Sequence, residues 1–236
     1  MKRCIITYAH GAHEELLDIS LPTYKNFAHK HGYDFAIGYK STNLPPAWNK
    51  IPLMLAALSA YEEVVWFDCD LVVVNPFDDF PPIREESFHA LVRHFEHNSE
   101  VPNSGVWRVR KNVTQLLVEM MKLEVFENHG WWEQAALLTL MGYCVPPEGS
   151  HYQDTQCRCV RPTRWYTGCE FMRLCWNCHP NYRAEHPRIV HCSYRSMPQR
   201  LDVMRALVKD PCYDYPKFEV NNDGQEENDD MVDKSS

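Results

Sequence analysis

The segment 64–76 constrains this 236-residue chain more than any other, because two carboxylates interrupt a long apolar run. It reads Val-Val-Trp-Phe-Asp-Cys-Asp-Leu-Val-Val-Val-Asn-Pro, with Asp68 and Asp70 at its centre. Residues two apart in a strand point to the same face, so we expect both side chains together at a strand end. Two carboxylates held so close repel each other and lose hydration, and a hard cation bound between them relieves both costs. The pattern therefore predicts a metal site that can also hold the oxygens of a diphosphate.

The pattern around this segment predicts an α/β fold. Strand-like and helix-like apolar runs alternate up to the carboxylates, which is typical of a sheet of mostly parallel strands. Besides the strand that carries the carboxylates, we expect strands at 3–9, 33–39, 88–95, 106–109 and 189–191. We expect helices at 14–31, 47–61, 112–128, 131–143 and 197–209. Pro22 could stop or kink the first of these helices. In such sheets, ligands bind at the carboxyl ends of the strands, where Asp68 and Asp70 are expected.

Charge is distributed unevenly along the chain, whose net charge is −8. Residues 219–236 carry seven acids and one lysine, and we expect them to form a disordered acidic tail. Residues 151–218 carry eleven lysines and arginines against six acids, so this segment can offset the charge of a phosphorylated ligand. Apolar stretches fall far short of the ~20 residues that span a bilayer, and the N-terminus lacks the apolar core of a secretory signal. We therefore expect a cytoplasmic protein.

Ten cysteines raise the question of a metal or disulfide framework, and six of them lie between 157 and 192. Cys157-Arg-Cys159 and Cys175-Trp-Asn-Cys178-His179 have a spacing that structural zinc tolerates, but two regular Cys-x-x-Cys pairs are not present. Cysteines of a cytosolic protein are commonly small buried hydrophobes. Two interpretations therefore remain, namely ordinary packing or a zinc-stabilised, non-catalytic binding module.

Four other short segments carry residues that could complete a site beside the carboxylates. These are Trp48-Asn49-Lys50, Asn103-Ser104-Gly105, Trp131-Trp132-Glu133-Gln134 and Ile189-Val190-His191. Lys50 can reach a phosphate, and Gly105 lets a flat ligand approach the backbone closely. Histidine at a strand end is a common ligand of the softer divalent ions. We expect Trp131, Trp132 and Trp165 to serve packing.

In this order, the segments resemble metal-dependent, GT-A type nucleotide-sugar glycosyltransferases. The chain looks most like the retaining Golgi α-galactosyl-, α-mannosyl- and α-xylosyltransferases, over most of residues 1–205. The resemblance implies a Rossmann-like, mostly parallel central sheet flanked by helices, in a single domain of two joined lobes. Residues 1–110 would bind the nucleotide sugar, and 111–218 would bind the acceptor and complete the catalytic site. Residues 219–236 would remain the acidic tail.

The resemblance also implies a role for each matching residue. A metal ion, Mn²⁺ or Mg²⁺, would be held by Asp68, Asp70 and His191, and would bridge the phosphates of a UDP- or GDP-sugar. The donor would be bound by Thr7, Tyr8, Lys50, Asp68, Asn103, Ser104 and Gly105. Glu133 and Gln134 would be the catalytic pair at the anomeric carbon, with retention of configuration. The acceptor stays open among glycans, lipids, proteins and nucleic acids, and so does the oligomeric state.

One further alternative rests on the same carboxylates. Asp68-Cys69-Asp70-Leu71-Val72 matches the Asp-x-Asp-x-(Thr/Val) motif of haloacid-dehalogenase-like phosphatases, in which the first aspartate attacks phosphorus. That motif normally opens a chain, whereas here a strand–helix–strand–helix pattern precedes it. The late paired acids that hold magnesium in that family are missing from 150–218. The residues therefore favour a glycosyltransferase over a phosphatase.

Overall fold

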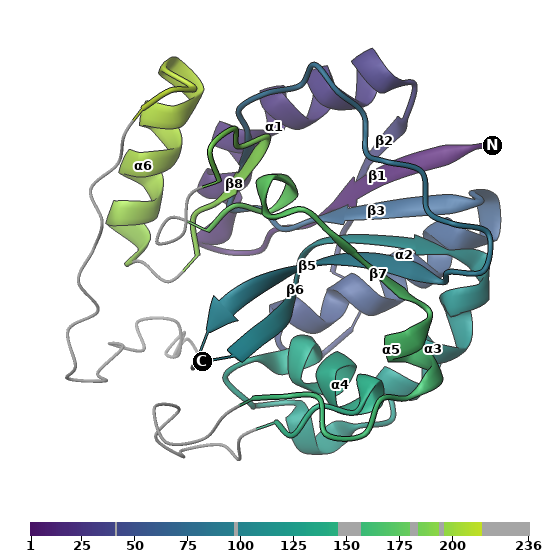
Figure 1. The fold of residues 1–236 in the computed structure, drawn as a ribbon. Coiled ribbons are helices and arrows are strands. Elements are labelled where there is room, and N and C mark those ends of the chain that lie inside the picture. Colours follow the sequence, from purple (N-terminus) through teal and green to yellow (C-terminus); the bar gives the residue numbers. More distant parts are fainter. Residues whose placement is uncertain (41, 97–98, 146–156, 180–183, 194–195, 214–236) are drawn as a thin grey trace.

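The computed structural model is an α/β sandwich with helices on both faces of a central sheet (Figure 1). The structure describes residues 1–40, 42–96, 99–145, 157–179, 184–193 and 196–213. The predicted acidic tail, 219–236, lies outside the described residues. None of the helices in the described ranges is long and apolar enough to cross a membrane.

The central sheet has six strands in the order β2-β1-β3-β6-β5-β7. They are β1 (Arg3–Thr7), β2 (Asp34–Ile37), β3 (Glu63–Phe67), β5 (His89–Glu96), β6 (Ser99–Arg110) and β7 (Cys169–Met172). β1 pairs in parallel with β2 and β3, β6 runs antiparallel to both of its neighbours, and β5 pairs in parallel with β7. All strands except β6 therefore point the same way, which confirms the mostly parallel sheet predicted from the sequence.

Strand alternation places the core on both faces of this sheet. Ile6, Val64 and Trp66 point into one cluster, whereas their neighbours Ile5 and Val65 point into the other. The helices are α1 (His13–His31), α2 (Lys50–Ala60), α3 (Thr114–Met120), α4 (Trp132–Met141), α5 (Arg164–Thr167) and α6 (Met197–Lys209). The short 3₁₀ helices are η1 (Pro46–Asn49), η2 (Lys111–Val113), η3 (Glu124–Phe126) and η4 (Leu174–Trp176). The first cluster packs against α2, α3 and α4, and the second against α1 (Figure 1).

Several predicted elements differ from the observed ones. α1 continues through Pro22, with Leu16, Leu17 and Tyr24 buried on either side of it. The predicted helix 112–128 ends at Met120, and η3 follows as a separate turn. β6 is longer than predicted, because its first half pairs with β5 despite its polar residues. Helix α5 and strand β7 were not predicted, since short elements carry little periodicity.

A second, two-stranded sheet positions one end of the site. It consists of β4 (Leu71–Val73) and β8 (Ile189–His191), which run antiparallel with Leu71 opposite His191. Val72 and Val190 pack with α1 and α6 in a third buried cluster. This packing brings the C-terminal part of the chain to the end of β3.

Candidate functional site

Asp68 and Asp70 lie in the turn that joins β3 to β4, and not at alternating positions of a strand as predicted. The turn is held by α1, because the Tyr24 hydroxyl oxygen lies 2.6 Å from the carbonyl oxygen of Asp68 and 2.9 Å from that of Leu71. The Asp68 N–H also donates to the Gly105 carbonyl at 2.9 Å. The two carboxylates are therefore brought together by a tertiary contact rather than by strand alternation.

His191 joins these carboxylates through the β4–β8 pairing. Its Nε2 lies 3.2 Å from Asp70 Oδ1 and 3.9 Å from Asp68 Oδ2. One ligand atom from each of the three residues lies within 4.8 Å of the other two. Among the described residues, this is the only group of three or more such side chains close enough to share a metal ion. Two carboxylates and one imidazole are a donor set that suits Mn²⁺ and also allows Mg²⁺.

The electrostatics of the group favour the ionised form of Asp70. Burial alone would raise the pKa of Asp70, but the adjacent His191 imidazole lowers this pKa well below its ordinary value, with a smaller effect from Arg200. Burial lowers the pKa of His191, yet Asp70 and Asp68 raise it by more, so the net shift is upward. Arg200, on α6, lies 3.7 Å from Asp70 Oδ2. It was not singled out from the sequence, although it belongs to the basic segment expected to offset a phosphorylated ligand.

Lys50 forms a second, adjoining cluster that links the turn to α4. Its Nζ lies 2.6 Å from Glu133 Oε1 and 3.1 Å from Asp68 Oδ1, and it donates to Ser104 Oγ at 3.1 Å. Lys50 and Glu133 are both buried. Burial lowers the pKa of Lys50, but Asp68 and Glu133 raise it by more, so the ammonium stays protonated. Four residues predicted separately from the sequence, Lys50, Asp68, Ser104 and Glu133, thus share one network of ion pairs and hydrogen bonds.

The predicted Asn103-Ser104-Gly105 segment lies within β6. Hydrogen bonds connect it to Gln134 on α4 and to Asn177. The Ser104 N–H donates to Gln134 Oε1 at 2.9 Å, and the Gly105 N–H donates to Asn103 Oδ1 at 2.9 Å. Asn177, which the sequence did not single out, donates to Asn103 Oδ1 at 2.8 Å. Because Gln134 Oε1 accepts from the backbone, its side chain fixes the position of β6 as well as facing the site.

The His191 ring packs directly against Gly105. A Cβ added to Gly105 would lie 2.5 Å from His191 Cε1 and 2.7 Å from Nδ1, distances that real Cβ atoms do not show. The imidazole therefore occupies the space that any other residue would fill with its side chain. The resemblance places Gly105 at a sugar pocket, and the structure adds this contact with His191, the third residue of the candidate metal site.

Thr7 and Tyr8, predicted to face a nucleoside, lie at the carboxyl end of β1 and are buried. Among the residues that the structure describes, no hydrogen-bond partner is found for Thr7 Oγ1 or Tyr8 Oη. Buried polar atoms are nearly always bonded, so both hydroxyls fit a ligand with hydrogen-bonding groups. Thr7 pairs with Phe67, so both residues lie beside the end of β3 that leads to Asp68.

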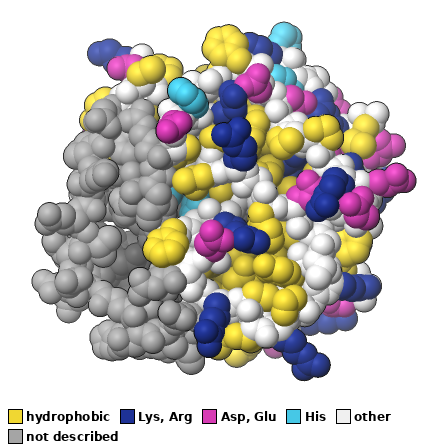
Figure 2. Space-filling model, in the orientation of Figure 1, with side chains coloured by type: hydrophobic (Ala, Val, Ile, Leu, Met, Phe, Trp, Pro, Cys, Tyr) yellow, Lys and Arg dark blue, Asp and Glu magenta, His cyan; other side chains and the backbone are white. Residues whose placement is uncertain are grey.

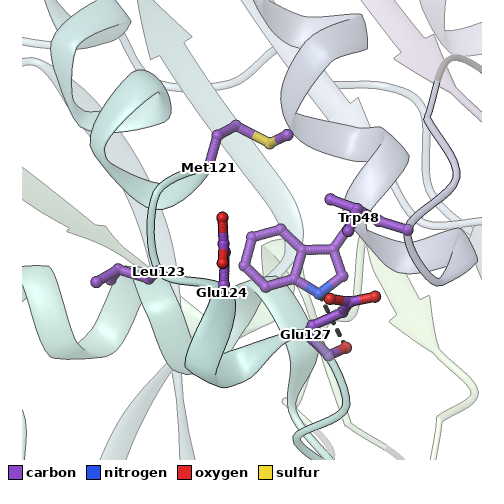
Figure 3. A pocket seen from close by; sticks show the side chains of 6 residues that line it. Trp48, Met121, Leu123, Glu124 and Glu127 are labelled. Atoms are coloured by element: carbon purple, nitrogen blue, oxygen red, sulfur yellow. Dashed lines mark hydrogen bonds between the residues drawn. The ribbon is translucent and has the colours of Figure 1, made fainter.

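A separate cavity of about 270 Å³ lies between η1 and the segment 121–127, and Figure 3 shows the side chains that line it. They are Leu44, Trp48, Met121, Leu123, Glu124 and Glu127. The Trp48 indole is only 2% exposed and donates to the Glu127 carbonyl at 3.2 Å. None of these residues belongs to the clusters around Asp70 and Lys50. Within Trp48-Asn49-Lys50, therefore, Lys50 reaches the site while Trp48 packs.

The cysteine-rich segment shows no second metal group within the described ranges. Cys157 and Cys169 are buried in the same cluster as Trp165, which is packed as predicted. Cys178 and Cys192 are also buried. These positions agree with the packing interpretation of the cysteines and lend no support to a zinc-stabilised module. The prediction for Trp132 is wrong, because this side chain is 44% exposed.

A family model and several solved structures match this chain. The model of the galactosyl transferase GMA12/MNN10 family matches residues 5–79, which include Lys50, Asp68 and Asp70. A search of curated proteins finds no match. A glycosyltransferase involved in glycosylation of the major capsid of PBCV-1 is similar in structure, with 14% identity and a TM-score of 0.64, over 87% of this chain and 100% of that chain.

Two further solved structures are similar to this chain. GlyE of Streptococcus pneumoniae TIGR4 is 12% identical with a TM-score of 0.55, over 88% of this chain and 62% of that chain. The galactosyltransferase LgtC, in complex with donor and acceptor sugar analogues, is 10% identical with a TM-score of 0.50, over 87% of this chain and 95% of that chain. The chain has the GT-A fold, as predicted, and the comparisons support a nucleotide-sugar glycosyltransferase. This fold disfavours the phosphatase alternative.

Proposed function

We propose that this protein is a metal-dependent glycosyltransferase that moves a sugar from a nucleotide-diphosphate donor to an acceptor with retention. The observation that carries the proposal is the convergence of Asp68, Asp70 and His191 at the end of β3 in a GT-A fold. Their oxygens and nitrogen would hold Mn²⁺ or Mg²⁺. A metal ion bound there would supply Lewis-acid stabilisation to the departing nucleoside diphosphate.

The protein's own residues would position the rest of the donor. Thr7 and Tyr8 would bind the nucleoside with the two buried hydroxyls that have no bond to the described chain. Lys50 would place positive charge 3.1 Å from Asp68 Oδ1, and Arg200 would place it 3.7 Å from Asp70 Oδ2. These cations would reduce the repulsion between a negative diphosphate and an acidic site.

Retention would need no covalent intermediate on the protein. Glu133 Oε1 is already 2.6 Å from Lys50 Nζ and accepts from Ser104 Oγ at 3.1 Å, so that oxygen is a poor nucleophile. We infer that the bond from the anomeric carbon to the diphosphate breaks while the acceptor oxygen bonds to the same face. The acceptor's proton would pass to an oxygen of the departing phosphate. Glu133 and Gln134 would shape the site around that carbon.

The proposal is tested with a panel of UDP- and GDP-sugars incubated with the full-length protein and Mn²⁺. We expect release of nucleoside diphosphate from at least one donor, and loss of this release when the metal is chelated. Nuclear magnetic resonance of the released sugar before mutarotation identifies the anomer. The proposal fails if no donor is turned over and no nucleoside diphosphate binds in the presence of Mn²⁺.

Substituting Gly105→Ala should weaken Mn²⁺ binding by about 10–100-fold, the usual effect of disturbing a residue that orients a metal ligand. The added methyl group would displace the His191 ring from the carboxylates. Isothermal titration calorimetry with Mn²⁺ alone measures this. The matched control is Gly38→Ala, where the new methyl group would instead crowd a terminal carbon of Leu53. Equal Mn²⁺ affinity in Gly105→Ala and Gly38→Ala would contradict the proposal that Gly105 leaves the space in which the His191 ring is held.

A further inference from the structure

Trp132 combines two unusual features at the first position of α4. Its φ is +41°, and it is the only non-glycine residue with a positive φ among the described residues. Its large side chain is also 44% exposed to solvent. A bulky side chain strongly disfavours this backbone region, whereas glycine adopts it freely. The chain therefore carries an aromatic residue where glycine would relieve strain.

The neighbouring tryptophans do not share this exposure. Trp131 packs against the cluster that lies under α4, and Trp165 is almost fully buried in it. Trp132 is not part of that cluster. Burial of apolar surface thus explains why tryptophan stands at positions 131 and 165, but it does not explain the solvent-exposed tryptophan at position 132. Residues held in strained backbone conformations cluster at active sites, ligand clamps and switch regions.

The position of Trp132 ties it to the proposed catalytic site. The next residue, Glu133, contacts Lys50 and Ser104, and Gln134 accepts from the backbone of β6. The first turn of α4 therefore adjoins the site, with Glu133 and Gln134 turned inward and Trp132 outward. The exposed indole therefore belongs to the residue directly before the buried Glu133, at the solvent-facing start of α4.

We propose that Trp132 is an acceptor platform and that the acceptor is a saccharide, whose ring stacks on the indole. This inference rests on the proposed function and names its acceptor class. The C–H face of a sugar ring is apolar and suits an aromatic surface, while the hydroxyl groups at its edge stay hydrated. A nucleic acid could also stack, but the net charge of −8 disfavours a polyanion. On the face in Figure 2, basic and acidic side chains are interspersed and do not form a basic stripe.

Trp132→Gly provides the direct test, because it removes the ring and the strain together. We expect its melting temperature to equal or exceed that of the wild type, which excludes misfolding as a cause. The probes are methyl glycosides of glucose, galactose, mannose and xylose, offered with the donor found in the nucleotide-sugar panel. The ratio of transfer to hydrolysis should fall at least about tenfold, mainly through a higher KM for the glycoside. Trp132→Phe, which keeps an aromatic face, should retain most of this ratio.

Phe77→Ala is the matched control, because Phe77 is 73% exposed and its ring lies under Lys30, away from α4. This variant should transfer like the wild type. Titration with the glycosides should also change the tryptophan fluorescence of the wild type and not that of Trp132→Gly. Unchanged transfer in Trp132→Gly, or wild-type transfer only to peptides, lipids or oligonucleotides, would overturn the inference. Failure of the wild type to cleave any donor would instead show that the proposed function is wrong.

Discussion

Asp70→Asn is expected to lower metal-dependent glycosyl transfer by about 10³-fold or more. Asp70 is the carboxylate closest to His191, at 3.2 Å, and it is nearly buried, so water cannot easily replace it as a ligand. Asparagine keeps the size of the side chain but removes its charge. Metal ions supply several kcal/mol of transition-state stabilisation, and each 1.36 kcal/mol corresponds to a factor of ten in rate.

Two measurements check this expectation. Initial rates with the donor found in the panel give the loss of activity, and calorimetry with Mn²⁺ alone gives the loss of binding. Asp202→Asn is the control, because Asp202 is an exposed acid on α6 that forms an ion pair with Arg205 of the same helix. If Asp70→Asn retained the Mn²⁺ affinity of Asp202→Asn, the metal site would lie elsewhere.

Lys50→Met is expected to destabilise the fold by about 3–5 kcal/mol, because it leaves a buried carboxylate without its counter-ion. The Lys50 ammonium lies 2.6 Å from Glu133 and 3.1 Å from Asp68, and Glu133 has almost no contact with solvent. Methionine fills a similar volume, so the loss would come from the charge and not from a cavity. Urea unfolding, followed by circular dichroism, measures the free energy of unfolding.

A double-mutant cycle separates the ion pair from other effects of these substitutions. Glu133→Gln should also destabilise the protein, because among the described residues it leaves the buried ammonium with Asp68 as its one ion-pair partner. The variant with both changes should regain part of the stability lost in Lys50→Met, since no uncompensated carboxylate is left at position 133. Strictly additive losses would show that Lys50 and Glu133 are not coupled.

The sequence was sufficient for most of the fold, because strands and helices reflect local apolar periodicity. The apolar run before Asp68 predicts a strand that the structure has as β3, and the helical spacing of 197–209 predicts a helix that the structure has as α6. Short elements such as α5 and β7 were missed, since they contain too few residues to show a period. The extent of β6 was also missed, because pairing with β5 overrides the polar residues in its first half.

The candidate site was found in part for the right reason and in part for the wrong one. Asp68 and Asp70 do gather, but through a turn held by Tyr24 and not through strand alternation. Arg200 and Asn177 carried no local motif, so nothing in the sequence marked them. The sequence predicts a packing role for Trp132, whereas its backbone conformation and exposure in the structure set it apart.

The sequence by itself determined the chemistry available to this protein, namely two close carboxylates, a late histidine and a buried-strand pattern around them. Only the tertiary structure decided which distant groups meet. Lys50 and Glu133 are 83 residues apart, and His191 reaches Asp70 through the pairing of β4 with β8. Local periodicity depends on neighbouring residues alone, whereas such contacts depend on how whole elements pack. For that reason, the residues of the candidate metal site were predictable from the sequence, but the contacts between them and the exposure of Trp132 were not.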